Sequence, residues 1–317
     1  SPKRPALEGM KLEKLNDQTI RFRLKQPHAP FLENLTLGIL PKHRFEPFDP
    51  ENFPLSQSNT EPIGSGPYQI KRVKRNSLGI PESYELTPFK DFALGEPKIG
   101  KLFFKFFPNE TELADAYRRR EVESLPAISA AMAKQLAEEG ERILSVSLPR
   151  VFGVFFNQNK AAVLADKDVR EALSLSVNRQ AVVNSVLYGF GQPAFGPLPQ
   201  VVADDQKVDP EAGRDLLLAK GWKFNEAEGI LEKKNKKEKL VLSFALSTAE
   251  TPELKEAASL IKQDFEKMGA RVELKVFELG DLNQNVIRPR EYEALFFGEV
   301  LGRQPDLFSF WHSSQRL

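Results

Sequence analysis

The sequence predicts an α/β fold made of two regions, the first rich in strands and the second rich in helices. Residues 11–107 alternate between apolar and polar side chains in short runs, which is typical of strands, whereas helical spacing dominates after Asn157. The clearest helix opens at Thr251-Pro252-Glu253 and ends at Gly269, and the alternating run 272–276 follows it directly. A helix that leads straight into a strand is typical of an α/β architecture.

The first region is expected to be rich in strands. Alternation over residues 11–25 predicts a hairpin that turns at Asn16-Asp17 and buries one face. Five prolines between 41 and 62 predict an irregular loop. Further strands are expected over 67–75, 82–87 and 99–107.

Helices begin at recognisable capping residues. Asn109, with Glu112 three residues later, predicts a helix that ends near Arg120, and a short helix is expected over 129–139. Residues 142–156 are expected to be extended. The remaining expected elements are helices over 166–176, 179–187 and 209–221 and a hairpin over 229–246.

Composition excludes several classes of function. The formal net charge is +1 over 317 residues, which argues against a broad nucleic-acid-binding surface. The chain has no cysteine, so zinc–thiolate sites, disulfides and cysteine nucleophiles are excluded. No run of residues is long and apolar enough to span a membrane. The residues 118–120 and 233–239 are basic runs that we interpret as solvated surfaces.

The residues do not form a catalytic, metal or nucleotide motif. The three histidines, His28, His43 and His312, lack the spacing of metal ligands, so neither a metal nor a cofactor is expected. Gly64 and Gly66 are not followed by the Gly-Lys-Ser/Thr of a phosphate loop, and a backbone turn before a strand explains them. No nucleophile is paired with a histidine base, so we expect no enzyme.

Several motifs occur in the order seen in one protein family. They are Leu40-Pro41-Lys42-His43, Pro62-Ile63-Gly64-Ser65-Gly66-Pro67-Tyr68, Asn157 followed by Asp168–Leu173, the Gly/Pro loop 191–199, and Asp209–Trp222. Together they resemble the bacterial extracellular solute-binding proteins of family 5, which serve peptide-type ABC importers. One departure is Gly213, which stands where the family usually has alanine.

The resemblance implies a clamshell of the periplasmic-binding-protein type II class, with two lobes of mixed sheet and helices. Residues 1–155 would form part of lobe I, left incomplete here, and residues 156–317 most of lobe II, with a hinge near 155–157. The implied function is capture of an oligopeptide for a membrane ABC permease. The protein would be a monomer in the periplasm or at the cell surface, where a lipoprotein anchor is one option. The alternatives are the sensing domain of a regulator and a hydrolase.

The resemblance also implies a ligand site in residues 298–306. Peptide binders of the family carry an aspartate here that receives the α-ammonium group of the ligand, and Arg303 occupies that place in this chain. Asp306 matches a second family aspartate. Either Glu299 replaces the missing carboxylate, or Arg303 binds a ligand carboxylate through its planar guanidinium; an outward-facing Arg303 at the rim is the alternative.

Three more residues complete the expected site, namely Gln304, Asn157 and Phe195. Phe195 lies in a glycine-rich loop, which favours exposure of its ring. Other phenylalanines could line the cleft, but strand phenylalanines usually fill cores, so we expect core packing for most of them. These are Phe155, Phe156, Phe296 and Phe297.

Overall fold

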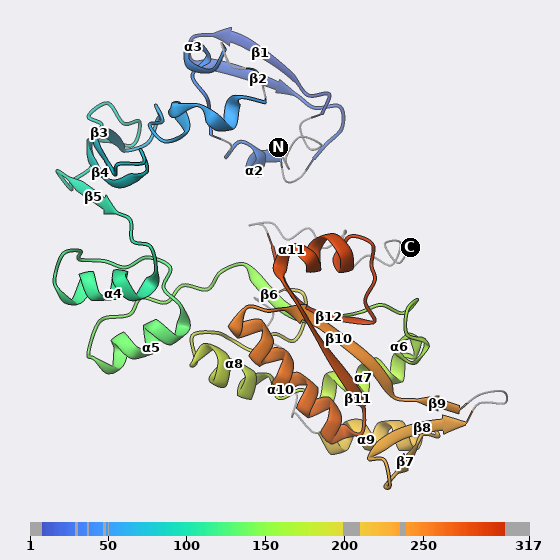
Figure 1. Cartoon of the computed structure of the whole chain (residues 1–317). Helices are drawn as coiled ribbons and strands as arrows, with labels where there is room; N and C mark the ends of the chain where they lie inside the picture. The colour runs from blue at the N-terminus through green and yellow to red at the C-terminus, as the bar shows by residue number, and fades with distance from the viewer. Residues whose placement is uncertain are drawn as a thin grey trace. The chain divides into compact units, whose positions relative to one another are not determined.

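The computed structural model describes residues 8–28, 31–36, 38–46, 49, 51–198, 210–234 and 239–301. The chain groups into two compact units, Ser1–Ile128 and Ser129–Leu317 (Figure 1). The lobe boundary expected between residues 155 and 156 stays a prediction, because compactness of a segment does not by itself define a lobe.

The first unit begins with the predicted hairpin. Strands β1 (Lys11–Asn16) and β2 (Thr19–Arg23) pair antiparallel, and the Asn16 side chain accepts a hydrogen bond from the Gln18 amide at 2.9 Å in the turn. The predicted buried face is wrong for the described residues, because Leu12 and Ile20 are exposed. A two-stranded ribbon has no second layer of its own to cover its apolar side.

Short helices replace the predicted loop over residues 41–62. They are α3 (Lys42–Phe45), η1 (Phe53–Leu55) and η2 (Gln57–Asn59), and α2 (Phe31–Asn34) precedes them. Each is a single turn or little more. Pro41 directly precedes α3, and Pro54 is the second residue of η1. Proline fits the first turn of a helix, so these prolines start turns here rather than prevent them.

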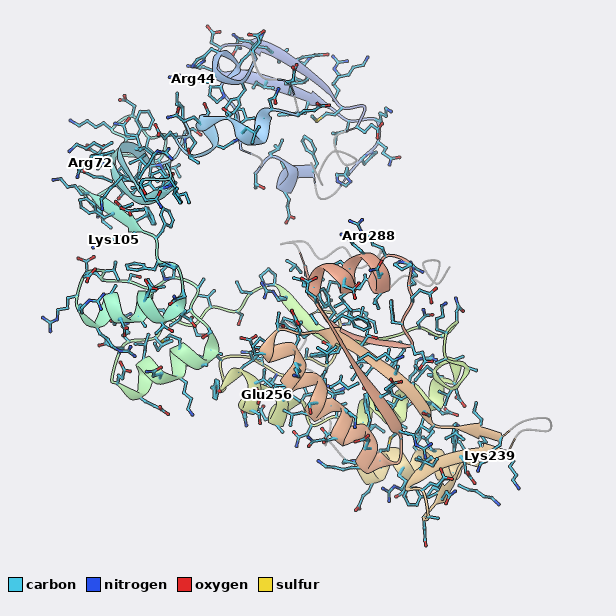
Figure 2. The ribbon with its side chains drawn as sticks, viewed as in Figure 1. Arg44, Arg72, Lys105, Lys239, Glu256 and Arg288 are labelled. Carbon is cyan, nitrogen blue, oxygen red and sulfur yellow. The ribbon has the colours of Figure 1, made fainter. Side chains whose placement is uncertain are left out.

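A three-stranded antiparallel sheet confirms the strands expected after the Gly64 loop. It consists of β3 (Tyr68–Arg75), β4 (Pro81–Pro88) and β5 (Leu102–Lys105). Glu85 on β4 is nearly buried and forms ion pairs with Lys71 at 3.1 Å and with Arg72 at 3.3 Å (Arg72 is labelled in Figure 2). The predicted capped helix follows as α4 (Glu110–Arg118), where Asn109 accepts a hydrogen bond from the Glu112 amide at 2.9 Å.

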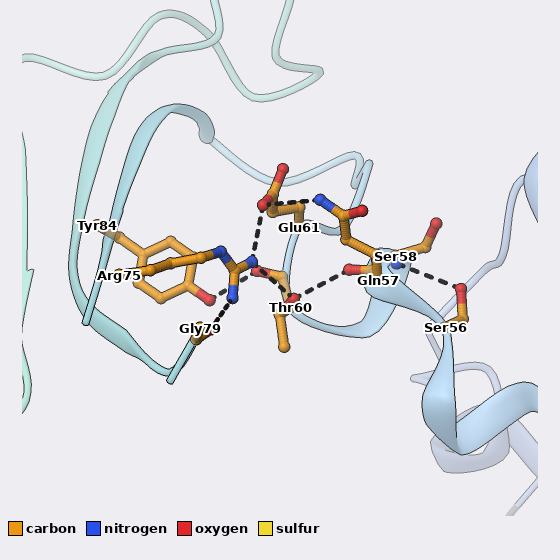
Figure 3. A network of polar contacts seen from close by, with 8 residues as sticks. All are labelled: Ser56, Gln57, Ser58, Thr60, Glu61, Arg75, Gly79 and Tyr84. Carbon is orange, nitrogen blue, oxygen red and sulfur yellow. Dashed lines mark hydrogen bonds and ion pairs between the residues drawn. The ribbon is translucent and has the colours of Figure 1, made fainter. Parts of the chain in front are cut away.

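A polar network ties the segment before β3 to the β3–β4 hairpin (Figure 3). Arg75 donates hydrogen bonds to the Glu61 carboxylate at 2.7 Å and to the Thr60 hydroxyl at 3.1 Å. The same guanidinium donates to the Gly79 carbonyl at 2.8 Å, and the Tyr84 hydroxyl donates to the Thr60 carbonyl at 2.7 Å. The network therefore fixes the chain that enters the Gly64–Pro67 turn.

Protonation of Glu61 is expected to weaken this network. The hydrogen bond from Arg75, assisted by one from Gln57, lowers the pKa of Glu61 below its ordinary value. A carboxyl group with a lowered pKa stabilises the fold above the ordinary pKa, about 4.3, and loses that contribution as the pH falls through the lower value of the folded chain. An NMR titration of the Glu61 carboxyl carbon should place its midpoint below that of a model peptide. In Arg75→Gln the midpoint should move back up; an unchanged midpoint would contradict the assignment.

The second unit is built on a four-stranded sheet in the order β11-β10-β12-β6. The strand β10 (Ser243–Ala249) lies parallel to β11 (Arg271–Phe277) and to β12 (Ala294–Val300). The fourth strand, β6 (Arg150–Phe156), pairs antiparallel with β12 over its whole length, so it reaches the sheet from a distant part of the chain. Only these seven residues of the predicted extended segment 142–156 form a strand.

Most helices of the second unit lie around this sheet (Figure 1). The long helix α10 (Pro252–Met268) connects β10 to β11, and α11 (Leu279–Asp281) with the π-helix η3 (Leu282–Ile287) connects β11 to β12. The other helices are α5 (Ala130–Glu138), α6 (Ala162–Ala165), α7 (Lys167–Ser176), α8 (Arg179–Leu187) and α9 (Pro210–Ala219).

An apolar stripe along α10 forms the centre of the core. Ile261, Phe265 and Met268 are buried in one cluster with Phe244 and Leu246 of β10. The helix ends at Gly269 with φ +113°, as the sequence predicts. Burial of one face of α10 on the sheet thus explains why apolar residues recur at helical spacing along the helix.

The predicted hairpin over residues 229–246 is correct in its first part and wrong in its last. Strands β7 (Lys223–Asn225), β8 (Ile230–Lys234) and β9 (Lys239–Val241) form a small antiparallel sheet, and Lys239 (Figure 2) pairs with Glu232. Residues from Ser243 onward leave this sheet and form β10. An apolar run can continue a hairpin or enter a buried parallel strand, and its local pattern does not distinguish the two.

Close packing of α9 on α7 explains why residue 213 is glycine. A Cβ atom added at Gly213 would lie 2.7 Å from the Ala172 carbonyl oxygen and 3.1 Å from the Met268 sulfur. The first of these contacts is to backbone, which cannot move aside as a side chain can. The departure from the family pattern therefore has a packing reason in this chain.

Gly213→Ala is expected to lower the free energy of unfolding by about 1–3 kcal/mol, the usual cost of overpacking a filled interior. Chemical denaturation followed by circular dichroism would measure it. Gly153→Ala is the matched control, because an added Cβ there meets nothing within 4 Å. Equal stability of the two variants would show that α9 shifts away from α7 at little cost.

Candidate functional site

The carboxyl edge of the four-stranded sheet is the place where the chain path reverses. From β10 the chain crosses to β11 on one side and then returns past β10 to β12 on the other. In open α/β sheets, ligands bind outside the carboxyl ends of the strands at such a reversal. The candidate site is therefore the edge formed by the ends of β10, β11 and β12 and the start of β6 (Figure 1).

Glu299 is the candidate residue that the structure places at this edge. It is the last residue but one of β12, lies opposite Val151 of β6, and is 8% exposed. A second carboxylate, Glu278, follows β11 and accepts hydrogen bonds from the amides of Gly280 at 2.9 Å and Asp281 at 3.1 Å. Glu278 therefore caps α11, whereas Glu299 is the carboxylate that a strand of the sheet itself carries to the edge.

Asn157 lies at the opposite end of β6. Its side-chain amide donates a hydrogen bond to the Arg290 carbonyl at 3.0 Å, and its side-chain oxygen accepts one from the Asn159 amide at 3.1 Å. Its backbone amide donates to the Glu293 carbonyl at 2.8 Å. In the described residues, Asn157 ties the loop after β6 to the loop before β12.

Phe195 is half-buried against the start of α8. The Arg179 guanidinium carbon lies 5.3 Å from the centre of its ring, and Arg179 donates a hydrogen bond to the Ser174 hydroxyl at 2.9 Å. Burial lowers the pKa of Arg179. The neighbouring Asn178 amide donates to Asp264, in the last third of α10, at 2.9 Å. The expected exposure of the ring is thus only partial, because a cation covers it.

The candidates in the described residues do not converge. Asn157 adjoins the amino end of β12, and Glu299 lies about 16 Å further along that strand at 3.3 Å per residue. Phe195 lies near the part of α10 that leads into the amino end of β11. The remaining three candidates, Arg303, Gln304 and Asp306, lie outside the described residues. The site as a whole stays a prediction.

The strand phenylalanines pack as expected. Phe296 is buried and Phe156 packs against the same cluster, with the Phe156 ring edge-to-face on Phe244 at 6.4 Å. Phe155 and Phe297 pack in a second cluster with Leu282 of η3. The prediction of core packing is confirmed for these side chains.

The helices α11 and η3, which lie at the carboxyl edge, were not predicted from the sequence. Leu282 and Val286 are buried and four residues apart, which is the helical signal that could have located them. The residues between them, Asn283–Asn285, are exposed. A π-helix is rare and often occurs at a functional site, so this segment adds polar amides to the candidate edge.

The described residues contain no group of three or more His, Asp or Glu side chains placed to hold a metal ion. Of the three histidines, His28 and His43 are described and His312 is not. Among the described helices, none combines the length and the apolar character needed to cross a membrane.

Comparison with known proteins identifies the family. The family model described as bacterial extracellular solute-binding proteins, family 5 (middle region) matches residues 2–315. The chain belongs to this family. The family-5 resemblance seen in the motifs is confirmed over nearly the whole chain, and the relatives named below are binding proteins rather than enzymes.

Two curated relatives are peptide-binding proteins. The oligopeptide-binding protein AppA of Bacillus subtilis is 26% identical and aligns with 96% of this chain and 56% of its own length. The dipeptide-binding protein of Escherichia coli is 24% identical and aligns with 90% of this chain and 52% of its own length. The chain thus spans about half the length of the curated relatives it matches.

Solved structures confirm the fold of type II periplasmic binding proteins. AppA of Bacillus subtilis in complex with a nonapeptide superposes with a TM-score of 0.62 at 24% identity, over 98% of this chain and 62% of that one. NikZ of Campylobacter jejuni in complex with Ni(L-His) superposes with a TM-score of 0.67 at 25% identity, over 99% and 62%. Members of this fold therefore hold ligands of different chemistry.

Proposed function

We propose that this chain is part of an extracytoplasmic receptor that captures an oligopeptide reversibly and delivers it to an ABC permease. The observation that carries the proposal is the family match over residues 2–315, together with relatives that bind oligopeptides and dipeptides. The reversal of the chain at the carboxyl edge of the β11-β10-β12-β6 sheet supports it, because that edge suits a ligand site.

Capture without chemical change accounts for the chemistry of the described residues. At the candidate edge, the described carboxylates include Glu250 directly after β10, the helix cap Glu278 and the strand residue Glu299, and the described residues contain no group of His, Asp and Glu side chains that could hold a metal ion. A peptide would be held chiefly by hydrogen bonds to its backbone and by water-mediated contacts. Closure of two lobes by a hinge near residues 155–157 would present the loaded protein to the permease.

Location outside the cytoplasm follows from the family, and a lipid anchor is the finer part of the proposal. A receptor that feeds a permease must stay near the membrane, and an acyl chain would keep it there. We propose that the receptor acts as a monomer.

The test uses the full-length protein purified from its native host. Native mass spectrometry would detect a co-purified ligand, and calorimetry would follow with peptides of two to nine residues and with nickel–histidine. We expect a bound peptide and micromolar or tighter binding of at least one peptide class. Binding of nickel–histidine with none of the peptides would overturn the proposed substrate class, and hydrolysis of a bound peptide would overturn the receptor function.

A further inference from the structure

One phenylalanine at the candidate edge lies across a glycine. Phe152 of β6 and Gly298 of β12 are direct cross-strand partners. A Cβ atom added at Gly298 would lie 2.6 Å from Cε1 of Phe152, so the ring occupies the space that a side chain on β12 would take. The Phe152 ring also contacts Phe296, with ring centres 6.5 Å apart. The Phe152 ring is therefore held in place by its contacts with Gly298 of β12 and with Phe296 of the core.

The same ring is still 43% exposed. Its strand neighbours in the core, Val154 and Phe156, pack against the main cluster, whereas Phe152 lies one step nearer the carboxyl edge. The Arg150 guanidinium carbon lies 5.9 Å from the centre of the Phe152 ring. Within the described residues, Arg150 forms no ion pair, so this cation beside the ring is not neutralised there.

The position of this pair matters as much as its exposure. Because β6 runs antiparallel to β12, its first residues lie at the carboxyl edge, next to Glu299 and Val300. The Phe152 ring is fixed against Gly298 and the residue still leaves part of its surface accessible. A rigid, partly exposed ring next to a cation is suited to contact an apolar group that lies beside a negative charge.

We propose that Phe152, supported by Gly298, is a specificity-determining contact for an apolar or aromatic side chain of the bound peptide. Arg150 favours peptides that carry a carboxylate next to that side chain. The proposal rests on the proposed peptide-binding function and adds the class of peptide: one with an aromatic residue beside an acidic group. An occupant from elsewhere in the full-length protein is the competing outcome.

The experiment measures discrimination rather than affinity alone. Calorimetry on the full-length protein would compare peptides of one length in which a single Phe is replaced by Ala, and a neighbouring Glu by Gln. The wild type should prefer the Phe peptide, and Phe152→Ala should reduce that preference about 2- to 10-fold, the range of an aromatic pair contact. Arg150→Gln should reduce the preference for Glu over Gln and leave the Phe preference intact.

A second variant tests the supporting glycine. Gly298→Ala places a methyl group where the ring now lies, so it should displace the ring and reduce the Phe preference as Phe152→Ala does. Leu218→Ala on α9 is the matched control, because Leu218 is 40% exposed, much like Phe152, and lies on a helix outside the candidate edge. It should leave the preference unchanged. Thermal melts without ligand accompany each variant.

The outcomes separate this inference from the proposed function. If no peptide binds the wild type, the proposed function fails and the inference with it. If peptides bind and Phe152→Ala leaves the preference for Phe over Ala intact, only the inference is overturned. A lower melting temperature of Phe152→Ala with unchanged preference would identify the ring as buried by another part of the protein, which also overturns it.

Discussion

Replacement of Phe265 by alanine is expected to lower the free energy of unfolding of the second unit by about 3–5 kcal/mol, the usual cost of removing a buried phenylalanine. Phe265 is 1% exposed and packs edge-to-face on Phe244, with ring centres 5.9 Å apart. It joins α10 to β10, so its loss leaves a cavity between the main helix and the centre of the sheet.

The measurement can use an internal probe. Trp222 is 2% exposed and belongs to the same core cluster, so its fluorescence should report unfolding of this unit. The second tryptophan, Trp311, would be replaced by Phe in every variant so that Trp222 alone is observed. Phe103→Ala is the control, since Phe103 is 59% exposed in the first unit. A loss for Phe265→Ala no larger than for Phe103→Ala would contradict the core assignment.

Glu299→Gln is expected to weaken peptide binding by the full-length protein about 10- to 100-fold. The value corresponds to loss of one charge-assisted hydrogen bond, about 1.5–3 kcal/mol. Glu299 is the candidate carboxylate that β12 brings to the edge, and Gln keeps its shape while removing its charge. Calorimetry should show the loss for a peptide with a free amino terminus and little loss for the same peptide when acetylated. Equal losses for both peptides would mean that Glu299 does not receive the ammonium group.

Arg303→Ala in the same assay distinguishes a carboxylate-binding Arg303 from an outward-facing Arg303 at the rim. If Arg303 binds a ligand carboxylate, the variant should weaken a peptide with a free carboxyl terminus and spare the amidated peptide. Unchanged affinity for the free and the amidated peptide would contradict carboxylate binding by Arg303 and support an outward-facing Arg303 at the rim.

The comparison of sequence and structure shows where local patterns suffice. Asn109 with Glu112 predicts the start of α4, and Thr251-Pro252 with Gly269 predicts both ends of α10. These capping residues are reliable signals because they satisfy the unpaired backbone N–H and C=O groups at a helix end, and those groups lie only a few residues away in the chain. The expected helices were found for this reason, whereas the strands that were found follow from the alternation of apolar and polar residues.

The candidate site was less accessible to prediction. The resemblance placed Asn157, Phe195 and Glu299 in one ligand site, but in the described residues Asn157 and Glu299 lie near opposite ends of β12, and Phe195 contacts Arg179 of α8. Phe152 was not singled out, because its exposure depends on a glycine that lies almost 150 residues later in the chain. Proximity between distant residues is set by strand pairing, and a local pattern carries no information about it.

The family, the α/β class and the boundaries of the capped helices could be predicted from local patterns, because motifs and caps are encoded within short windows. The strand order, the departure of Ser243 from the small sheet and the need for glycine at position 213 became evident from the folded chain alone. Each of these depends on which distant surfaces pack together, and that choice reflects the free energy of the whole core rather than the preference of any one segment.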